Sequence, residues 1–572
     1  MKTEQIKHRA ALIDRVLPLL FGSHSSLQDR VNTVRALPSP AFAVAAAVGA
    51  TCKETAFTES ANLFLDAIPS VAFDEPSPLL GLASVLLYFR GEDRLAFRHR
   101  HRLEDFFEEA LPSYLESASE FCGVLDAPRA QTMTVLFLLG QRFLSAAARD
   151  AATRQLLSLE RMLEDRDTLS EYNSPATLAA VLHALAALVN LVEDADVRAR
   201  ARKCESALWH SATQTYDRQA GILSGPYSVA KKADLWAEDN PMRLLWDAIL
   251  GPRMPIRPFA DSEGDGALLA LASMVSAEDY HCPAASIRHS LERPYPFRIA
   301  LEAEIPPSKE EDPAFLPCRY PSGTVSLFAA FHDGFSLATA SRPFGDGSET
   351  HNFFAAVKRP WVRSEKDVST LFASLAKGGK ENGGREISFQ GERTAMVLFF
   401  PKPTVDDTAS SELRLTVTRH ETSLLEMRVG PRPFRGGDKV SFTHAPLCLS
   451  FGNVYAAIYP LLGDFCTVRA EAKDGALTLA MTDAEKESRP LTVEEQRRER
   501  RGFGITFSGR EEAGSFEEFC RRAEEYVLRD EWIEATEERH VSLRAGGEHL
   551  ECAVCPHTEG IRYLRAGGKN LI

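Results

Sequence analysis

The feature that most constrains the fold of this chain is a change in the spacing of its apolar residues near residue 280. Before this point apolar residues recur at intervals of three and four, as in the stretch 132–144, and this spacing buries one face of a helix. After it, runs such as 324–329, 394–400 and 413–418 lie between turns rich in Pro and Gly and are typical of strands. The sequence therefore predicts a helical half followed by a β half.

Short polar or Pro-containing connectors separate the apolar segments of the first half. The predicted helices are 4–21, 27–36, 54–67, 77–90, 102–123, 129–147, 149–164, 175–193, 195–215, 240–249 and 264–276. Connectors this short join helices into antiparallel hairpins. Because no repeat of fixed length is visible, a closed (α/α) toroid or an irregular bundle is favoured over an open solenoid, and we expect the toroid.

The second half contains enough strand-like segments for stacked sheets. Besides the three runs above, strands are predicted near 335–341, 422–428, 439–443, 447–458, 465–470, 476–481, 503–508, 539–544 and 560–564, with one helix at about 515–529. We therefore expect two domains, an α/α toroid over 1–280 and an antiparallel β-sandwich over 281–572, with the boundary between about 275 and 300.

Length and charge exclude several classes of protein. The 572 residues exceed what one hydrophobic core usually supports, and 44% apolar with 26% charged residues is typical of a soluble globular protein. The formal charge of −14 argues against a general nucleic-acid binder and against a protein that binds acidic membranes. We expect neither kind of partner.

The N-terminus mixes charges and lacks the apolar core of a signal peptide, and the ten Cys are scattered as reduced core thiols would be. A cytoplasmic protein is predicted, or a secreted one if an upstream segment has been trimmed. No metal ligands are assigned, since the one close Cys pair, Cys552 and Cys555, has no second pair nearby. No cofactor is predicted, a divalent metal in the β domain stays open, and the sequence does not indicate the oligomeric state.

The stretch from Glu171 to Trp236 carries the candidate site. In Glu171-Tyr172-Asn173-Ser174-Pro175, either Asn173 or Ser174 can cap a helix, with Pro175 where no N–H is needed. The apolar segment 176–193 then buries one face and leaves this polar start at an end of the helical layer, where it would be accessible.

The chain resembles the heparinase II/III-like and chondroitin AC/alginate lyase-like polysaccharide lyases. The resemblance rests on the layout of a helical half and a β half and on three short segments, 171–175, Gly225-Pro226-Tyr227-Ser228 and 340–347. In such relatives a His commonly follows the Gly-Pro pair and an Arg follows the Ser, whereas this chain has Tyr227 and Val229 at those positions.

The resemblance implies a lyase that cleaves a uronate-containing polysaccharide or oligosaccharide by β-elimination. In this scheme Asn173 binds the substrate carboxylate and Tyr227 acts as acid or base, and the two residues face one cleft. The residues implied to bind the anionic glycan are Glu171, Tyr172, Trp236, Arg342 and His351, of which the last two belong to a segment of the β half that closes the cleft.

Two alternatives stay open at this stage. A glycoside hydrolase could pair Glu171 with a carboxylate from the set Asp234, Glu238 and Asp239, because such enzymes use two carboxylates and also occur on helical toroids. A non-catalytic carbohydrate-binding or scaffold protein would suit the Tyr at position 227, where the relatives commonly have His.

Overall fold

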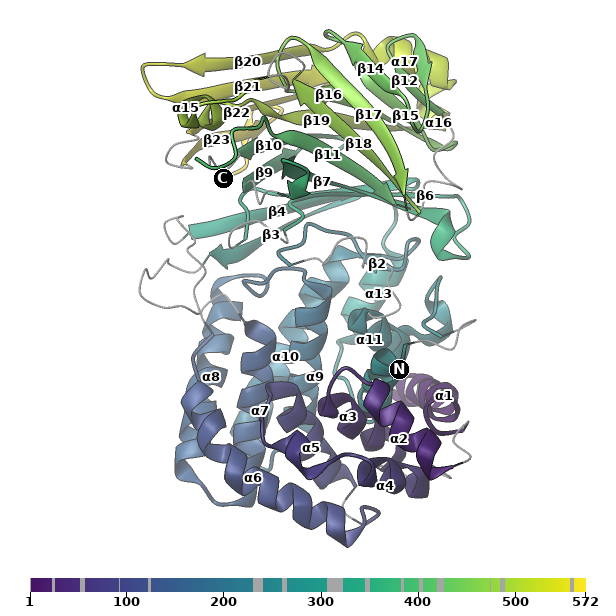
Figure 1. Ribbon diagram of the computed structural model, residues 1–572, viewed down its shortest axis with the longest axis vertical. Coiled ribbons are helices and arrows are strands. Elements are labelled where there is room, and N and C mark those ends of the chain that lie inside the picture. The colour runs from purple at the N-terminus through teal and green to yellow at the C-terminus, as the bar shows by residue number, and fades with distance from the viewer. Residues whose placement is uncertain are drawn as a thin grey trace. The chain divides into compact units, whose positions relative to one another are not determined.

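A computed structural model of the chain divides into two compact units, which are described separately (Figure 1). The helical unit comprises Met1–Gln214 and Asp234–Leu291, and the β unit comprises Thr215–Ala233 and Glu292–Ile572. The structure describes residues 2–22, 26–51, 57–91, 93–121, 125–229, 240–259, 265–305, 323–344, 350–381, 385–400, 405–418, 426–473, 475–483, 489–555 and 560–572. Among the helices described, none combines the length and the hydropathy that crossing a membrane requires.

The helical unit consists of helices and their connectors. They are α1 (Lys2–Phe21), α2 (Leu27–Ala36), α3 (Pro40–Thr51), α4 (Thr58–Asp66), α5 (Pro78–Arg90), α6 (Phe97–Ser117), α7 (Asp126–Arg142), α8 (Ala146–Asp165), α9 (Pro175–Leu191), α10 (Ala195–Thr215), α11 (Pro241–Leu250), α12 (Gly266–Ser276) and α13 (Ala284–Glu292), with short 3-10 turns at Ser70–Phe73 and Gly251–Arg253.

Six of these helices pack on one another in a closed cycle. Helix α3 contacts α5, α5 contacts α7, α7 contacts α9, α9 contacts α11, α11 contacts α12, and α12 returns to α3. Helices α3, α5, α9 and α12 bury most of their residues because each has neighbours on more than one side. The sequence predicts burial of one face of α9, but residues all round the helix are buried.

The β unit is built from antiparallel strands. They are β1 (Tyr216–Asp217), β2 (Ile222–Leu223), β3 (Phe297–Ile305), β4 (Gly323–Phe331), β5 (Phe335–Ala340), β6 (Phe353–Lys358), β7 (Val368–Lys377), β8 (Lys380–Glu381), β9 (Arg385–Gln390), β10 (Thr394–Phe400), β11 (Glu412–Thr418), β12 (Glu426–Val429), β13 (Arg432–Phe434), β14 (Lys439–Phe442), β15 (Leu447–Ser450), β16 (Val454–Pro460), β17 (Cys466–Lys473), β18 (Ala476–Asp483), β19 (Arg501–Gly509), β20 (Val527–Ile533), β21 (Glu538–Ala545), β22 (Glu548–Cys555), β23 (Gly560–Ala566) and β24 (Lys569–Asn570). Short helices α15 (Val493–Arg497), α16 (Arg510–Ala513) and α17 (Phe516–Ala523) and the 3-10 turn Glu365–Asp367 lie between strands.

Within the described residues these strands form three large sheets and the small β1–β2 pair. The first has the order β14-β17-β18-β11-β7-β6-β5-β4-β3 with β8 paired to β7, the second β13-β12-β15-β16-β19-β10-β9, and the third β20-β21-β22-β23-β24. Strand β10 shows how the second sheet separates two cores. Val397 and Phe399 pack toward the first sheet, while Met396 and Leu398 pack toward the third, as a period of two requires. This confirms the predicted fold class, a helical domain followed by an antiparallel β-sandwich.

Several local predictions were wrong or incomplete, and three of them have a clear physical reason. The segment 447–458 is a hairpin rather than one strand, because Gly452 at φ 87° reverses the chain between β15 and β16. The helix expected over 515–529 ends at Ala523, and strand β20 follows it. Helix α3 was missed because its run of Ala and Val has no polar face to give a period.

A short segment between α10 and α11 belongs to the β unit rather than to the helical unit. Its β1–β2 hairpin is fastened by an ion pair between Asp217 and Lys358, whose side chains are both fully buried and whose Oδ2 and Nζ atoms lie 2.8 Å apart. The Tyr295 hydroxyl also donates to Asp217 at 2.9 Å, and Gln219 donates to Asp333 at 2.7 Å. These contacts place the following residues, Ser224 to Ser228, in the β unit as well.

Candidate functional site

Tyr227 and His351 are joined by their backbones in the β unit. The N–H of each donates to the carbonyl oxygen of the other at 2.9 Å. Gly225 permits this approach, because its φ is +23° and an added Cβ would lie only 2.6 Å from the Cβ of Phe354. The structure thus brings together the Gly-Pro-Tyr-Ser loop and the end of the Arg342 to His351 segment.

Hydrogen bonds from Thr350 hold the same region together. Its Oγ1 atom lies 3.0 Å from the Ser228 carbonyl oxygen and 3.1 Å from that of Phe344. Arg342, two residues past the end of β5, is partly exposed. We call Tyr227, Ser228, Arg342, Phe344, Thr350 and His351 the 227–351 junction. Residues 345–349 lie outside the described residues.

The side chain of Tyr227 is fully buried in this junction. Its hydroxyl donates to the carbonyl oxygen of Leu223, and its ring packs edge-on against Phe354 with centroids 5.0 Å apart. Burial raises the pKa of the Tyr227 phenol far above its ordinary value. In this arrangement the phenol is a neutral hydrogen-bond donor, so it is poorly suited to act as a base.

His351 and its neighbours are fixed by packing and by a buried carboxyl group. The imidazole of His351 stacks on the Phe372 ring with centroids 4.3 Å apart, and only 4% of the residue is exposed. The next two backbone N–H groups, of Asn352 and Phe353, donate to the Glu386 carboxyl at 3.3 and 2.6 Å. Burial raises the pKa of Glu386 to about 8, although these hydrogen bonds oppose the shift.

The residues 171–174 lie in the helical unit, where α9 begins. Asn173 adopts the left-handed backbone conformation with φ 51°, which Asn tolerates better than most side chains. The N-cap of α9 is Ser174, whose Oγ donates to the Thr177 hydroxyl at 3.2 Å instead of capping the backbone. Tyr172 is fully buried and Asn173 is 7% exposed.

Glu171 caps a different helix from the one that follows it in sequence. Its carboxylate accepts the N–H groups of Leu125 and Asp126, at 3.1 and 3.2 Å, at the start of α7. The Glu171 N–H donates in return to the Asp126 carboxyl at 3.3 Å. Burial, followed by the charge of Glu171, raises the pKa of Asp126 to about 7, and burial also raises the pKa of Glu171.

Sequence reasoning missed Asp126 as the partner of Glu171. The only signal was an acidic residue just before the predicted helix 129–147, where a carboxylate favours a helix N-terminus. The predicted partners Asp234, Glu238 and Asp239, and the predicted glycan-binding Trp236, lie outside the described residues. Among the residues that are described, no group of three or more His, Cys, Asp or Glu side chains is arranged to hold a metal ion.

The structure therefore separates the predicted site residues into two sets. Tyr227, Arg342 and His351 belong to the β unit, whereas Glu171, Tyr172 and Asn173 belong to the helical unit. Arg342 is partly exposed, although its Nε atom is buried, and a guanidinium can bind a carboxylate with two hydrogen bonds. The buried groups of the junction and of the α9 start serve mainly to hold the backbone.

No family model matches the sequence, and a search of curated proteins also finds no match. Solved structures with a similar fold include the chondroitin AC lyase of Streptomyces coelicolor A3 in complex with chondroitin sulphate, at 10% identity and a TM-score of 0.41, covering 96% of this chain and 92% of that one. Heparinase III is similar at 9% identity and a TM-score of 0.33, covering 85% of this chain and 75% of its own. The similarity to these polysaccharide lyases is one of fold.

Proposed function

We propose that the protein binds a uronate-containing glycan through the 227–351 junction of its β unit without cleaving it. The observation that carries this proposal is the state of Tyr227. Its phenol is buried, donates to the Leu223 carbonyl and has a raised pKa, while Arg342 is partly exposed. The junction thus offers a cation for a carboxylate, whereas its phenol is not a ready base for the carbon-bound proton.

The class of ligand is supported by the sequence and by the chemistry of Arg342. The layout of the chain and its three short segments resemble the uronate-cleaving lyases, and a planar guanidinium matches a carboxylate with paired hydrogen bonds. A β-elimination would also need a proton acceptor near neutral pH, and a phenol with a pKa above its usual value of about 10 is protonated there.

A lyase is the second candidate, with Asn173 binding the substrate carboxylate and Tyr227 acting as the acid. The backbone pairing of Tyr227 with His351 favours this candidate, because the two paired residues carry a phenol and an imidazole. A raised pKa keeps the phenol protonated, as a proton donor to the leaving oxygen must be. In this candidate the hydroxyl leaves the Leu223 carbonyl when substrate binds.

A binding protein and a lyase can be distinguished with a panel of uronate polysaccharides. Each polysaccharide is assayed for binding and for the ultraviolet absorbance of an unsaturated product. We expect binding without new absorbance. Arg342→Gln should weaken this binding about tenfold, the effect of losing one hydrogen bond between charged groups, whereas Arg363→Gln, at an exposed Arg of the same unit, should not change it.

Other results contradict the proposal in distinct ways. New absorbance that Tyr227→Phe abolishes in a folded protein would establish the lyase instead. Reducing ends without that absorbance would indicate hydrolysis. Absence of both binding and product across the panel, or equal binding by the Arg342→Gln variant, would remove the junction as a glycan site.

A further inference from the structure

The β unit contains a pocket of about 550 Å³ where the ends of all three large sheets meet. Phe442 and His444 come from the end of β14 and its turn, Leu461 and Asp464 from the turn after β16, Arg500 from the residue before β19, and the segment 524–530 from the end of α17 and from β20. This volume is within the range of sites for small molecules. None of these residues takes part in the 227–351 junction.

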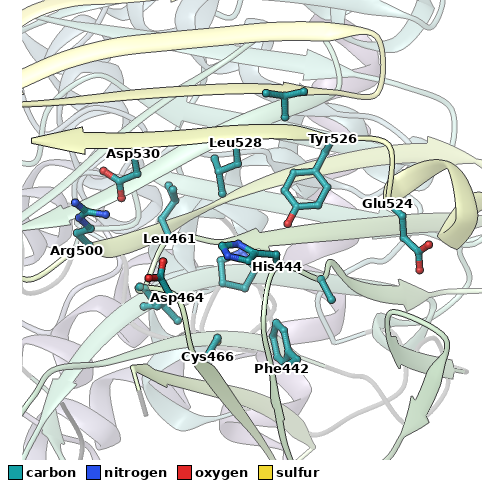
Figure 2. A pocket seen from close by; sticks show the side chains of 15 residues that line it. Phe442, His444, Leu461, Asp464, Cys466, Arg500, Glu524, Tyr526, Leu528 and Asp530 are labelled. Carbon is teal, nitrogen blue, oxygen red and sulfur yellow. The ribbon is translucent and has the colours of Figure 1, made fainter. Parts of the chain in front are cut away.

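The lining combines an apolar middle with polar ends. In the view of Figure 2, Arg500 and Asp464 lie toward the left of the pocket and Glu524 toward the right, with Leu461, Leu528, His444 and Tyr526 between them. The Tyr526 ring is held by the ring of Tyr459, with centroids 4.7 Å apart, and burial raises the pKa of its phenol. Tyr526 is thus a neutral aromatic wall with a hydroxyl at its edge.

The charges in the pocket do not favour an anionic ligand. The Nε and Nη2 atoms of Arg539 donate hydrogen bonds to the two carboxylate oxygens of Asp530, at 2.9 and 2.8 Å. Burial alone would raise the pKa of Asp530, but the Arg539 charge and hydrogen bonds outweigh it and lower the pKa. Among the described residues that line the pocket, the exposed carboxylates of Asp464 and Glu524 therefore outnumber the one guanidinium, that of Arg500.

Two residues at the pocket adopt left-handed backbone conformations. His444 has φ 46°, which is uncommon for a residue with a side chain, and Gly463 has φ 117°. Such conformations persist where surrounding contacts enforce them, and they concentrate at ligand sites. His444 makes none of the hydrogen bonds described for the structure, so its ring can serve a ligand in the pocket.

We propose that this pocket binds a neutral sugar of one or two rings. The apolar face of a pyranose packs on Tyr526, as sugar rings do on aromatic side chains, and its hydroxyls bond to the carboxylates of Asp464 and Glu524 and to Arg500. The site is independent of the proposed uronate site, because it lies on other elements and its charge selects against a carboxylate.

Calorimetric titration of the whole protein tests this inference with methyl glucoside, methyl mannoside, N-acetylglucosamine and glucuronate at concentrations up to about 10 mM. At least one neutral sugar should bind, and glucuronate should bind more weakly. Asp464→Ala and Tyr526→Leu should each weaken binding about tenfold. Glu525→Ala, at the exposed neighbour of Glu524 that does not line the pocket, should leave the affinity unchanged.

Three results would overturn the inference. They are absence of binding by every neutral sugar, tighter binding of glucuronate than of any neutral sugar, and unchanged affinity in the folded Asp464→Ala protein. Arg342→Gln separates the two sites, because it should weaken binding of the uronate polysaccharide and leave the neutral sugar unaffected. Failure at one site therefore does not imply failure at the other.

Discussion

At the scale of single residues, the ionisation of Glu386, which binds the backbone beside His351, should make the stability of the protein depend on pH. Its pKa is about 8 in the folded protein against 4.5 for an unperturbed Glu, so the folded state holds more protons than the unfolded state between these values. Stability should therefore decrease as pH rises from about 4.5 to about 8, by an amount on the order of a few kcal/mol. Asp126, with a pKa of about 7, contributes in the same direction in the helical unit.

Glu386→Gln checks this assignment, because glutamine keeps an acceptor for the Phe353 N–H and cannot ionise. The difference in unfolding free energy between pH 5 and pH 8, measured with denaturant, should be smaller in the variant than in the parent. Glu392→Gln, at an exposed position two residues before β10, is the matched control. An unchanged difference in the Glu386 variant would show that this carboxyl does not titrate in that range.

The sequence identified the residues of the candidate site better than it identified their partners. The three short segments could be singled out by their resemblance to segments of known lyases, and the structure does bring Tyr227 next to His351. The partners could not be inferred, because Glu171 bonds to Asp126 across 45 positions of the chain and Asn352 to Glu386 across 34. Such contacts depend on which helices and strands become neighbours.

At the scale of elements, the β1–β2 hairpin depends on the ion pair between Asp217 and Lys358. Lys358→Met should destabilise the protein by about 3–5 kcal/mol, because it leaves the Asp217 carboxylate buried without its countercharge. The double variant Asp217→Asn with Lys358→Met should recover much of this loss. Lys366→Met, at an exposed Lys of the same unit, should change the unfolding free energy little.

Unfolding in denaturant measures all of these variants. A Lys358→Met protein within about 1 kcal/mol of the parent would mean that the hairpin does not need this pair. The double variant also separates charge from packing, since a loss of packing alone would leave it no more stable than the single variant.

Some elements were predicted with small or no errors at their ends. Strand β10 matches its predicted range of 394–400, and α2 matches 27–36. The errors arose where periodicity was absent or ambiguous, as in the Ala-rich α3 and in 515–529, whose charge pattern continues past the end of α17 into β20. The assignment of the β1–β2 hairpin to the β unit has no local signal, because tertiary contacts decide it.

At the scale of the whole molecule, the β unit is incomplete when cut at its main boundary. A fragment of residues 292–572 lacks Asp217, so its Lys358 would be buried without a countercharge or would open the surrounding packing. Lys358→Met should therefore raise the melting temperature of the fragment, although the same change lowers it in the full chain. Thermal unfolding followed by circular dichroism, on the fragment and on the full chain, measures these opposite changes. A lower melting temperature of the Lys358→Met variant in both proteins would contradict the prediction.

The same ion pair has a consequence for the order in which the protein is made. Asp217 leaves the ribosome 141 residues before Lys358, a delay of roughly 7–30 s at ordinary rates of synthesis. During this interval the hairpin has no sheet to join, although the helices on both sides of it become complete in sequence about halfway through. The helical unit must therefore fold while the hairpin is still unpaired, because its partner strands have not yet been synthesised. A pause in translation after residue 291 would lengthen the time that the hairpin stays unpaired.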